Sequence, residues 1–401
     1  MRRALLALVV LALAPAGARA DELSIYSSLP LQGDARPQAL DVVRGMRLAL
    51  EEHGGMAGPH RIRYLSLDDS TAAAGMWDPA AVARNARRAA QDPTTIAYLG
   101  EFNSGASAIT IPILNEGGIL TVSPSNTYVG LTRAEGADRG EPRKYYPTGV
   151  RTYGRVVPAD HIQATALARW VRSYGVTRPY VIDDGEVYGH GLASMVVRRM
   201  AALGLRLAGR SRTPARRPGS AAARIARRAK AAKADAIVYA GITQNDAAKV
   251  LNAVGRRVPG VLVFASDGVA EERFTRHALR GLRPRLRLTD PALPPADYGA
   301  AGAAFADRFR QRWGHAPEPY AIFGYEAMAV VLDAVAAAGP DRQRVIDAFF
   351  ATRDRDSVLG RYSIDAHGDT TLAPYGGLTV SPGGRLLHDT MIDASPIPGA
   401  G

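Results

Sequence analysis

The chain has 401 residues, of which 47% are hydrophobic and 22% are charged. This composition is typical of a globular protein and excludes a disordered or collagen-like chain. A single hydrophobic core rarely grows beyond ~250–300 residues, so we expect two lobes. No cysteine is present, which excludes disulfides, thiolate metal sites, a cysteine nucleophile and a lipid-anchoring cysteine.

The net charge is +12, and its densest block lies between Arg206 and Lys233, which contains ten basic residues and no acidic or aromatic one. Nucleic-acid binding favours aromatic side chains among the basic ones, because bases stack on them. The block therefore favours a solvent-exposed helix face. Docking to an acidic partner or an anionic membrane surface is one alternative, and nucleic-acid binding is a weaker one.

The first 20 residues have the three parts of a secretory signal peptide. Arg2 and Arg3 precede the apolar run of residues 4–14, and Ala18-Arg19-Ala20 forms a small-residue cleavage site. A run of 11 residues is too short for a transmembrane helix, which needs ~20. We expect cleavage after Ala20, a mature charge of +9 and a periplasmic or secreted protein without a lipid anchor.

Short apolar strands alternate with amphipathic helices along the chain. In the first half we predict strands at 23–28, 62–67, 96–99 and 119–122, and helices at 42–52, 79–90 and 107–115. From residue 151 the pattern repeats, with predicted strands at 179–182, 236–239, 261–265 and 283–289 and predicted helices at 161–174, 191–203, 224–233, 246–254, 300–313, 320–338 and 345–350. Residues 360–364 and 378–380 are predicted to form a hairpin. This alternation indicates an α/β fold with parallel sheets covered by helices on both faces.

Motifs for catalysis are missing from the sequence. It contains no G-x-S-x-G, no phosphate loop, no H-E-x-x-H and no histidine pair at metal-ligand spacing. Gly189-His190-Gly191 resembles a dinucleotide-binding turn, but Ser194 stands where the third glycine belongs. Asp68-Asp69 and Asp183-Asp184 follow strands and could form a glycosidase pair, although capping of a turn or helix is favoured. We therefore predict a protein that is not an enzyme and that needs no metal or cofactor.

Polar loops at strand ends predict a binding site instead, because ligands of open α/β sheets bind there. One loop contains Ser104, and the next contains Ser125, Asn126 and Thr127. Their hydroxyls and the backbone amides at helix N-termini suit a carboxylate. Asp267, from the other half of the chain, supplies a negative charge. A cleft with these two walls suits the zwitterion of an α-amino acid.

Several segments in order resemble the type I periplasmic solute-binding proteins, in particular the branched-chain amino-acid-binding proteins of ABC importers. They include LPLQGD, YLSLDDS, GILTVSPSNT, VYGHGL and VFASDGV, and the resemblance covers essentially the whole chain after residue 20. It implies two doubly wound Rossmann-like lobes joined by three crossovers near residues 151, 288 and 371. Lobe 1 would comprise 21–150 plus 288–370, and lobe 2 would comprise 151–287 plus 371–401.

The resemblance also implies roles for site residues. The ligand carboxylate would be held by Ser104 and by the loop of Ser125, Asn126 and Thr127, and its ammonium by Asp267, where the amino-acid binders usually have Glu. Tyr188 would close over the ligand. Ile242 stands where some members have an aromatic residue, and Phe102 either lines the pocket or packs in the core.

The predicted function follows from these expectations. The protein would capture a small amino-acid-like ligand between its lobes and deliver it to an ABC permease, its only link to the membrane. It would act as a monomer and would not bind nucleic acid. A ligand-sensing role is an alternative, as is an amide, a urea-like compound or an aromatic acid in place of an aliphatic amino acid.

Overall fold

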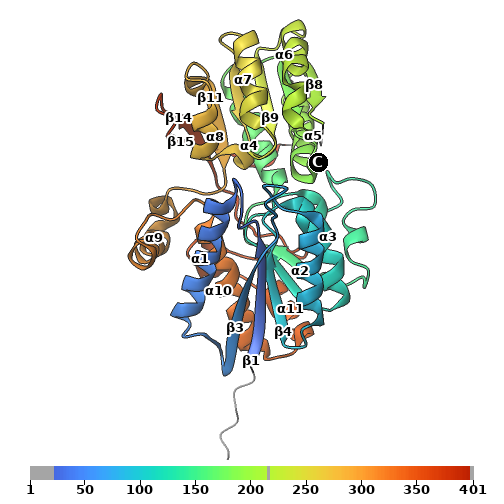
Figure 1. Cartoon of the computed structure of the whole chain (residues 1–401), viewed down its shortest axis with the longest axis vertical. Helices are drawn as coiled ribbons and strands as arrows, with labels where there is room; N and C mark the ends of the chain where they lie inside the picture. The colour runs from blue at the N-terminus through green and yellow to red at the C-terminus, as the bar shows by residue number, and fades with distance from the viewer. Residues whose placement is uncertain (1–21, 215–216, 398–401) are drawn as a thin grey trace, which may run out of the picture.

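The computed structural model describes residues 22–214 and 217–397, so the predicted signal peptide lies outside the described residues. Two lobes are stacked along the long axis of the molecule, each built on its own sheet (Figure 1). The lower lobe in this view contains the N-terminal strand, and the upper lobe contains the middle of the chain. The expected α/β architecture with two lobes is confirmed.

The first sheet has the order β2-β3-β1-β4-β5-β6. Its strands are β1 (Glu22–Leu29), β2 (Met56–Ala57), β3 (His60–Asp68), β4 (Thr95–Gly100), β5 (Leu120–Ser123) and β6 (Tyr153–Arg155). All neighbours pair in parallel except β2, which is antiparallel to β3. The helices of this lobe are α1 (Arg36–Glu52), α2 (Pro79–Gln91), α3 (Ser104–Glu116), α9 (Gly299–Trp313), α10 (Ala321–Ala338) and α11 (Arg342–Phe350).

Alternation of side chains along each strand explains why both faces of the sheet are covered. Ala97 and Leu99 of β4 join the core beneath α1 and α10, whereas Tyr98 points to the other face, beneath α2 and α3. Helix α10 is long and apolar enough to span a membrane, but it packs in this core against α1 and α11, as a core helix of a globular lobe does.

The second sheet has the order β15-β14-β11-β10-β9-β7-β8. Its strands are β7 (Pro179–Asp183), β8 (Gly209–Arg212), β9 (Ala236–Ala240), β10 (Leu262–Ala265), β11 (Leu286–Asp290), β14 (Tyr375–Val380) and β15 (Leu386–Ile392). The helices α4 (Asp160–Ser173) and α5 (Val187–Ala202) cover one face, and α6 (Ala222–Ala231), α7 (Ala247–Arg257) and α8 (Glu272–His277) cover the other. Strands β7 to β11 are parallel, while β14 and β15 are antiparallel additions at one edge.

The chain moves between the sheets three times. It leaves the first sheet after Arg155, leaves the second after Asp290, and returns to the second at Tyr375. Strand β6 pairs with β5 and therefore lies in the first sheet. The first crossing thus comes just after the position near residue 151 where it was expected. The exact residue ranges of the lobes stay a prediction.

The predicted hairpin near the C-terminus is wrong. Gly360–Tyr362 (β13) pairs with Arg355–Ser357 (β12), whereas β14 pairs with β11 and β15. Local turn residues favour pairing between the two segments, but β14 has a longer-range partner, β11, in the second sheet.

The arginine-rich segment contains more than an exposed helix face. Its early part forms β8 at the sheet edge, where Arg210 and Arg212 form ion pairs of 3.0 and 2.9 Å with the buried Asp183. Only α6 matches the expected amphipathic helix, with Ile225 and Ala229 buried and its arginines exposed. Part of the basic charge thus neutralises a structural carboxylate.

Candidate functional site

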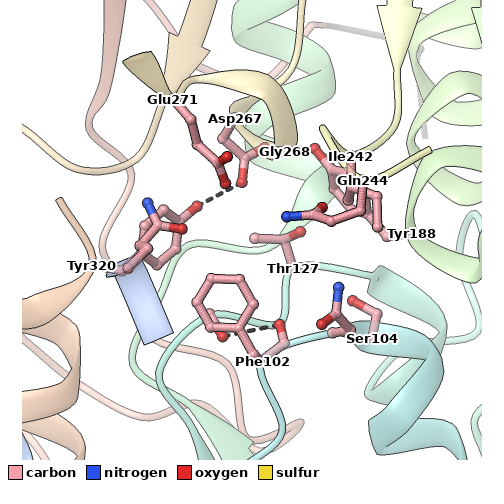
Figure 2. A pocket seen from close by; sticks show the side chains of 13 residues that line it. Phe102, Ser104, Thr127, Tyr188, Ile242, Gln244, Asp267, Gly268, Glu271 and Tyr320 are labelled. Atoms are coloured by element: carbon pink, nitrogen blue, oxygen red, sulfur yellow. Dashed lines mark hydrogen bonds between the residues drawn. The ribbon is translucent and has the colours of Figure 1, made fainter. Parts of the chain in front are cut away.

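A cavity lies between the lobes, where the carboxyl ends of the two sheets face each other. It is open to solvent, and its atom-free space of about 480 Å³ includes part of that solvent. Loops after β4 and β5 form one wall, and loops after β9 and β10 form the opposite wall (Figure 2). The lining residues are Gln38, Phe102, Asn103, Ser104, Ser125, Thr127, Tyr188, Ile242, Gln244, Asp267, Gly268, Glu271 and Tyr320.

Seven of the eight predicted site residues line this cavity, and Asn126 does not. The side chain of Asn126 is fully buried behind the loop. Its amide donates to the carbonyl oxygen of Phe102 (2.9 Å), and its oxygen accepts hydrogen bonds from Ser107 and Tyr153. The side chain of Asn126 therefore supports the loops. It does not point into the cavity, so its geometry does not favour the expected direct contact with a ligand.

The hydroxyl of Ser123 also ties these loops together. It accepts the N–H groups of Ser125 (3.1 Å) and Asn126 (2.9 Å) and donates to the carbonyl of Glu101 (2.9 Å). Ser125 in turn donates its hydroxyl to the carbonyl of Phe102 (3.0 Å). The backbone amides of Ser125 and Asn126 are thus already used inside the loop.

The groups left on this wall for an anion are Ser104, Thr127 and the N-terminus of α3. Ser104 is the first residue of this 13-residue helix, so unpaired N–H groups and the positive end of the helix dipole lie at the cavity edge. Ser104 lies inside the helix and Asn103 at its N-cap position, so capping does not explain the serine. Its hydroxyl accepts the Tyr128 N–H at 3.4 Å.

On the opposite wall, Asp267 is the centre of a hydrogen-bond network. Its carboxylate accepts from Tyr188 and from Gln163 at one oxygen and from Tyr320 at the other, each at 2.5 Å. Tyr320 immediately precedes α10 of the first lobe, so this bond links the lobes. Burial and the charge of Asp267 raise the pKa of both phenols well above the usual value, so both remain donors at neutral pH.

Two further acids lie close behind this network. Asp160 and Asp290 are almost completely buried. Burial, followed by the charge of Asp267, raises the pKa of each carboxyl well above its usual value. Ionisation of both carboxyls is therefore disfavoured beside Asp267.

Asp184 positions the loop that follows β9. It accepts the N–H of Ile242 (2.9 Å) and the side-chain amide of Asn245 (3.0 Å), and its second oxygen accepts the N–H of Glu186 (3.0 Å). Burial raises its pKa to about 7. This carboxylate shapes the wall that carries Ile242 and Gln244, as expected for an acid that caps a turn.

Gly268 lines the cavity at a position that has no room for a side chain. A Cβ at this position would lie 2.5 Å from the carbonyl oxygen of Gly241 and 3.0 Å from the ring of Tyr188. The Asp267-Gly268 pair therefore brings three polypeptide segments into contact around the carboxylate.

Six lining residues were missed at the sequence level: Gln38, Asn103, Gln244, Gly268, Glu271 and Tyr320. Asn103 and Gly268 adjoin the predicted Ser104 and Asp267, so the same strand-end loops could have indicated them. Gln38 and Tyr320 start helices in distant parts of the chain. No local pattern marks them, because only the packing of α1 on α10 brings these helix starts to the cavity.

A second contact between the lobes lies beside the cavity. Arg273 of α8 pairs with Asp34 of the first lobe at 2.5 Å. Within the described ranges 22–214 and 217–397, no group of three or more acidic or histidine side chains is arranged to hold a metal ion.

Comparison with known proteins agrees with this architecture. The profile of a family described as periplasmic binding protein matches residues 27–384. The chain is 24% identical over 361 residues to a Leu/Ile/Val-binding protein homologue of Brucella abortus, covering 88% of this chain and 89% of that protein. Its fold is similar to a leucine-binding protein of Thermotoga maritima, with a TM-score of 0.78, 22% identity and coverage of 92% and 99%.

Another structural neighbour binds a different kind of ligand. A solute-binding protein of an ABC transporter from Rhodopseudomonas palustris, solved with 3,4-dihydroxybenzoic acid, has a TM-score of 0.74 and 16% identity and covers 94% of this chain and 99% of its own. The fold therefore accommodates ligands with and without an amino group. The match across nearly the whole chain, the two doubly wound lobes and the cavity between them show that this protein belongs to the type I periplasmic binding protein family.

Proposed function

We propose that the protein captures a small α-amino acid in the cavity between its lobes and delivers it to an ABC permease. One observation carries the proposal: Asp267 lies on one wall of the cavity, and the N-terminus of α3 with Ser104 lies on the other. The carboxylate suits the α-ammonium, and the helix N-terminus suits the α-carboxylate. The two walls belong to different lobes, so a zwitterion that contacts both would stabilise their association.

The family is one of solute-binding proteins, which supports a binding role. It also supports an extracytoplasmic location, and with the features of residues 1–20 we propose export followed by cleavage after Ala20. We further propose that the mature protein is a monomer and reaches the membrane only through the permease. A sensor role would use the same cavity with a signalling partner in place of the permease.

Isothermal titration calorimetry tests the ligand class. The panel would contain the standard amino acids, their amides, urea, benzoate and 3,4-dihydroxybenzoate. We expect amino acids to bind and Asp267→Asn to weaken them at least tenfold, since a hydrogen bond to a charged group contributes about 1.5–3 kcal/mol. Asp297→Asn, a control at an exposed position outside the cavity, should leave binding unchanged. Binding of the aromatic acids alone would refute the proposal.

A further inference from the structure

The charges that line the cavity are unusual for a site that takes a neutral zwitterion. Asp267 and Glu271 both line it, and no lysine, arginine or histidine does so among the described residues. One carboxylate balances an α-ammonium and the helix N-terminus can hold an α-carboxylate, so the second carboxylate has no counterpart in an amino acid with an uncharged side chain.

Helix capping does not explain the position of Glu271. It stands at the N-cap of α8, where an acid often caps the helix, yet its side chain makes no capping hydrogen bond. The neighbouring Arg273 pairs with Asp34 instead of Glu271. In Figure 2 the carboxyl group of Glu271 points into the cavity, on the same wall as the carboxylate of Asp267.

The electrostatic setting of Glu271 adds to this argument. The pKa of Glu271 is raised to about 7, chiefly by burial and to a smaller extent by the charges of Glu318 and Asp34, while the hydroxyl of Thr243 and the charge of Arg273 oppose the shift. The raised pKa means that the charged form of Glu271 is disfavoured, and a cation that enters beside it stabilises that form.

The rest of the lining does not suit a branched aliphatic side chain. Ile242 is the one aliphatic side chain among the described lining residues, whereas Gln38, Asn103 and Gln244 contribute amides. Aromatic rings of Phe102 and Tyr320 complete the wall, with their centroids 6.0 Å apart. A protonated nitrogen can form cation–π interactions with aromatic faces and can donate hydrogen bonds to amide oxygens.

We propose that the ligand is an α-amino acid whose side chain ends in a protonated nitrogen, with its α-ammonium at Asp267 and its second cation at Glu271. This inference rests on the proposed function and narrows its ligand class. It sets this protein apart from relatives named for leucine, isoleucine and valine.

Pairs of ligands that differ only in the terminal ammonium test the inference. Titration calorimetry would compare ornithine with norvaline and lysine with norleucine. We expect at least one cationic member to bind about tenfold or more tightly than its uncharged counterpart. Glu271→Gln should abolish that preference, while Glu272→Gln, whose carboxylate pairs with Arg276 outside the cavity, should retain it.

The outcomes separate this inference from the proposed function. If norvaline or norleucine binds more tightly than its charged counterpart, the second cation is refuted while the amino-acid site stands. If Glu271→Gln weakens charged and uncharged ligands equally, Glu271 only shapes the cavity and the inference fails. If no amino acid binds the folded wild-type protein, the proposed function itself is refuted.

Discussion

The hydrogen bond between Tyr320 and Asp267 joins the two lobes inside the cavity. Tyr320 is only 4% exposed, and its hydroxyl lies 2.5 Å from the carboxylate. We predict that Tyr320→Phe shifts the protein towards separated lobes. The ring remains, so its packing against Phe102 and Phe323 is retained and only the O–H is lost.

The magnitude follows from the other partners of Asp267. A hydrogen bond to a charged group contributes about 1.5–3 kcal/mol. Asp267 keeps the hydroxyl of Tyr188 and the amide of Gln163 in the variant, so it is not left unpaired and the lower end applies. About 1.5 kcal/mol corresponds to an approximately tenfold change in the ratio of contacting to separated lobes.

Single-molecule fluorescence energy transfer measures this ratio directly. Since the chain has no cysteine, dyes can be attached at Arg87→Cys on α2 and Arg227→Cys on α6, which are exposed positions in different lobes. We expect Tyr320→Phe to increase the low-transfer population.

Tyr325→Phe is the matched control. It removes a Tyr–carboxylate hydrogen bond five residues further along the chain, in α10, but Tyr325 and its partner Glu52 (2.6 Å) belong to one lobe. If both variants give the same distribution as the unaltered protein, the bond to Asp267 does not hold the lobes together and the reasoning is refuted.

Three further predictions follow from named contacts. Arg273→Gln removes the exposed ion pair with Asp34, which contributes about 1 kcal/mol or less. It should therefore change the fluorescence distribution less than Tyr320→Phe does, and the change should vanish in 1 M salt. A salt-independent effect would contradict this prediction. Asp369→Asn leaves the fully buried Arg155 without its carboxylate partner, which lies at 2.9 Å. The variant should lose about 3–5 kcal/mol of unfolding free energy in urea titrations. A loss below about 1 kcal/mol would refute the role of the pair. Burial alone would raise the pKa of Asp369, but the charges of Arg155 and Arg133, with the hydrogen bond from Arg133, together hold this pKa below the usual value. The stability that depends on this pair is therefore present above about pH 4 and lost as the pH falls through the lowered pKa, and the unaltered protein should lose more stability than Asp369→Asn on acidification. Gly268→Ala places a Cβ 2.5 Å from the carbonyl of Gly241 and should reduce ligand affinity in calorimetry at least tenfold; unchanged affinity would show that the loop can move apart.

Local patterns in the sequence predicted the strands and helices that form the two sheets. A continuous apolar run marks β9, in which Ile237 and Tyr239 face α6 and α7 while Val238 faces α4 and α5. The pattern is local because each buried side chain is set by the strand period of two. Pairing over longer distances was not predictable in this way, and β14 was assigned to the wrong partner because its neighbour β11 is far away in the chain.

The site residues show the same difference between local sequence patterns and long-range packing. Ser104, Thr127 and Asp267 could be predicted from sequence because each follows a strand, and strand ends of parallel sheets gather at one edge. Their roles in binding stay predictions. Asn126 looked equivalent to its neighbours, yet its hydrogen bonds turn it away from the cavity.

Strand and helix periods and turn residues are properties of neighbouring residues, so the sequence predicts two α/β lobes with polar loops at the strand ends. Which distant residues meet at the cavity depends on tertiary packing. Tyr320 and Gln38 reach it from helix starts, and Glu271 adds a second carboxylate beside Asp267. The reason is physical: the charge balance of a cleft between two lobes depends on how the lobes pack, and packing joins segments that no local pattern relates.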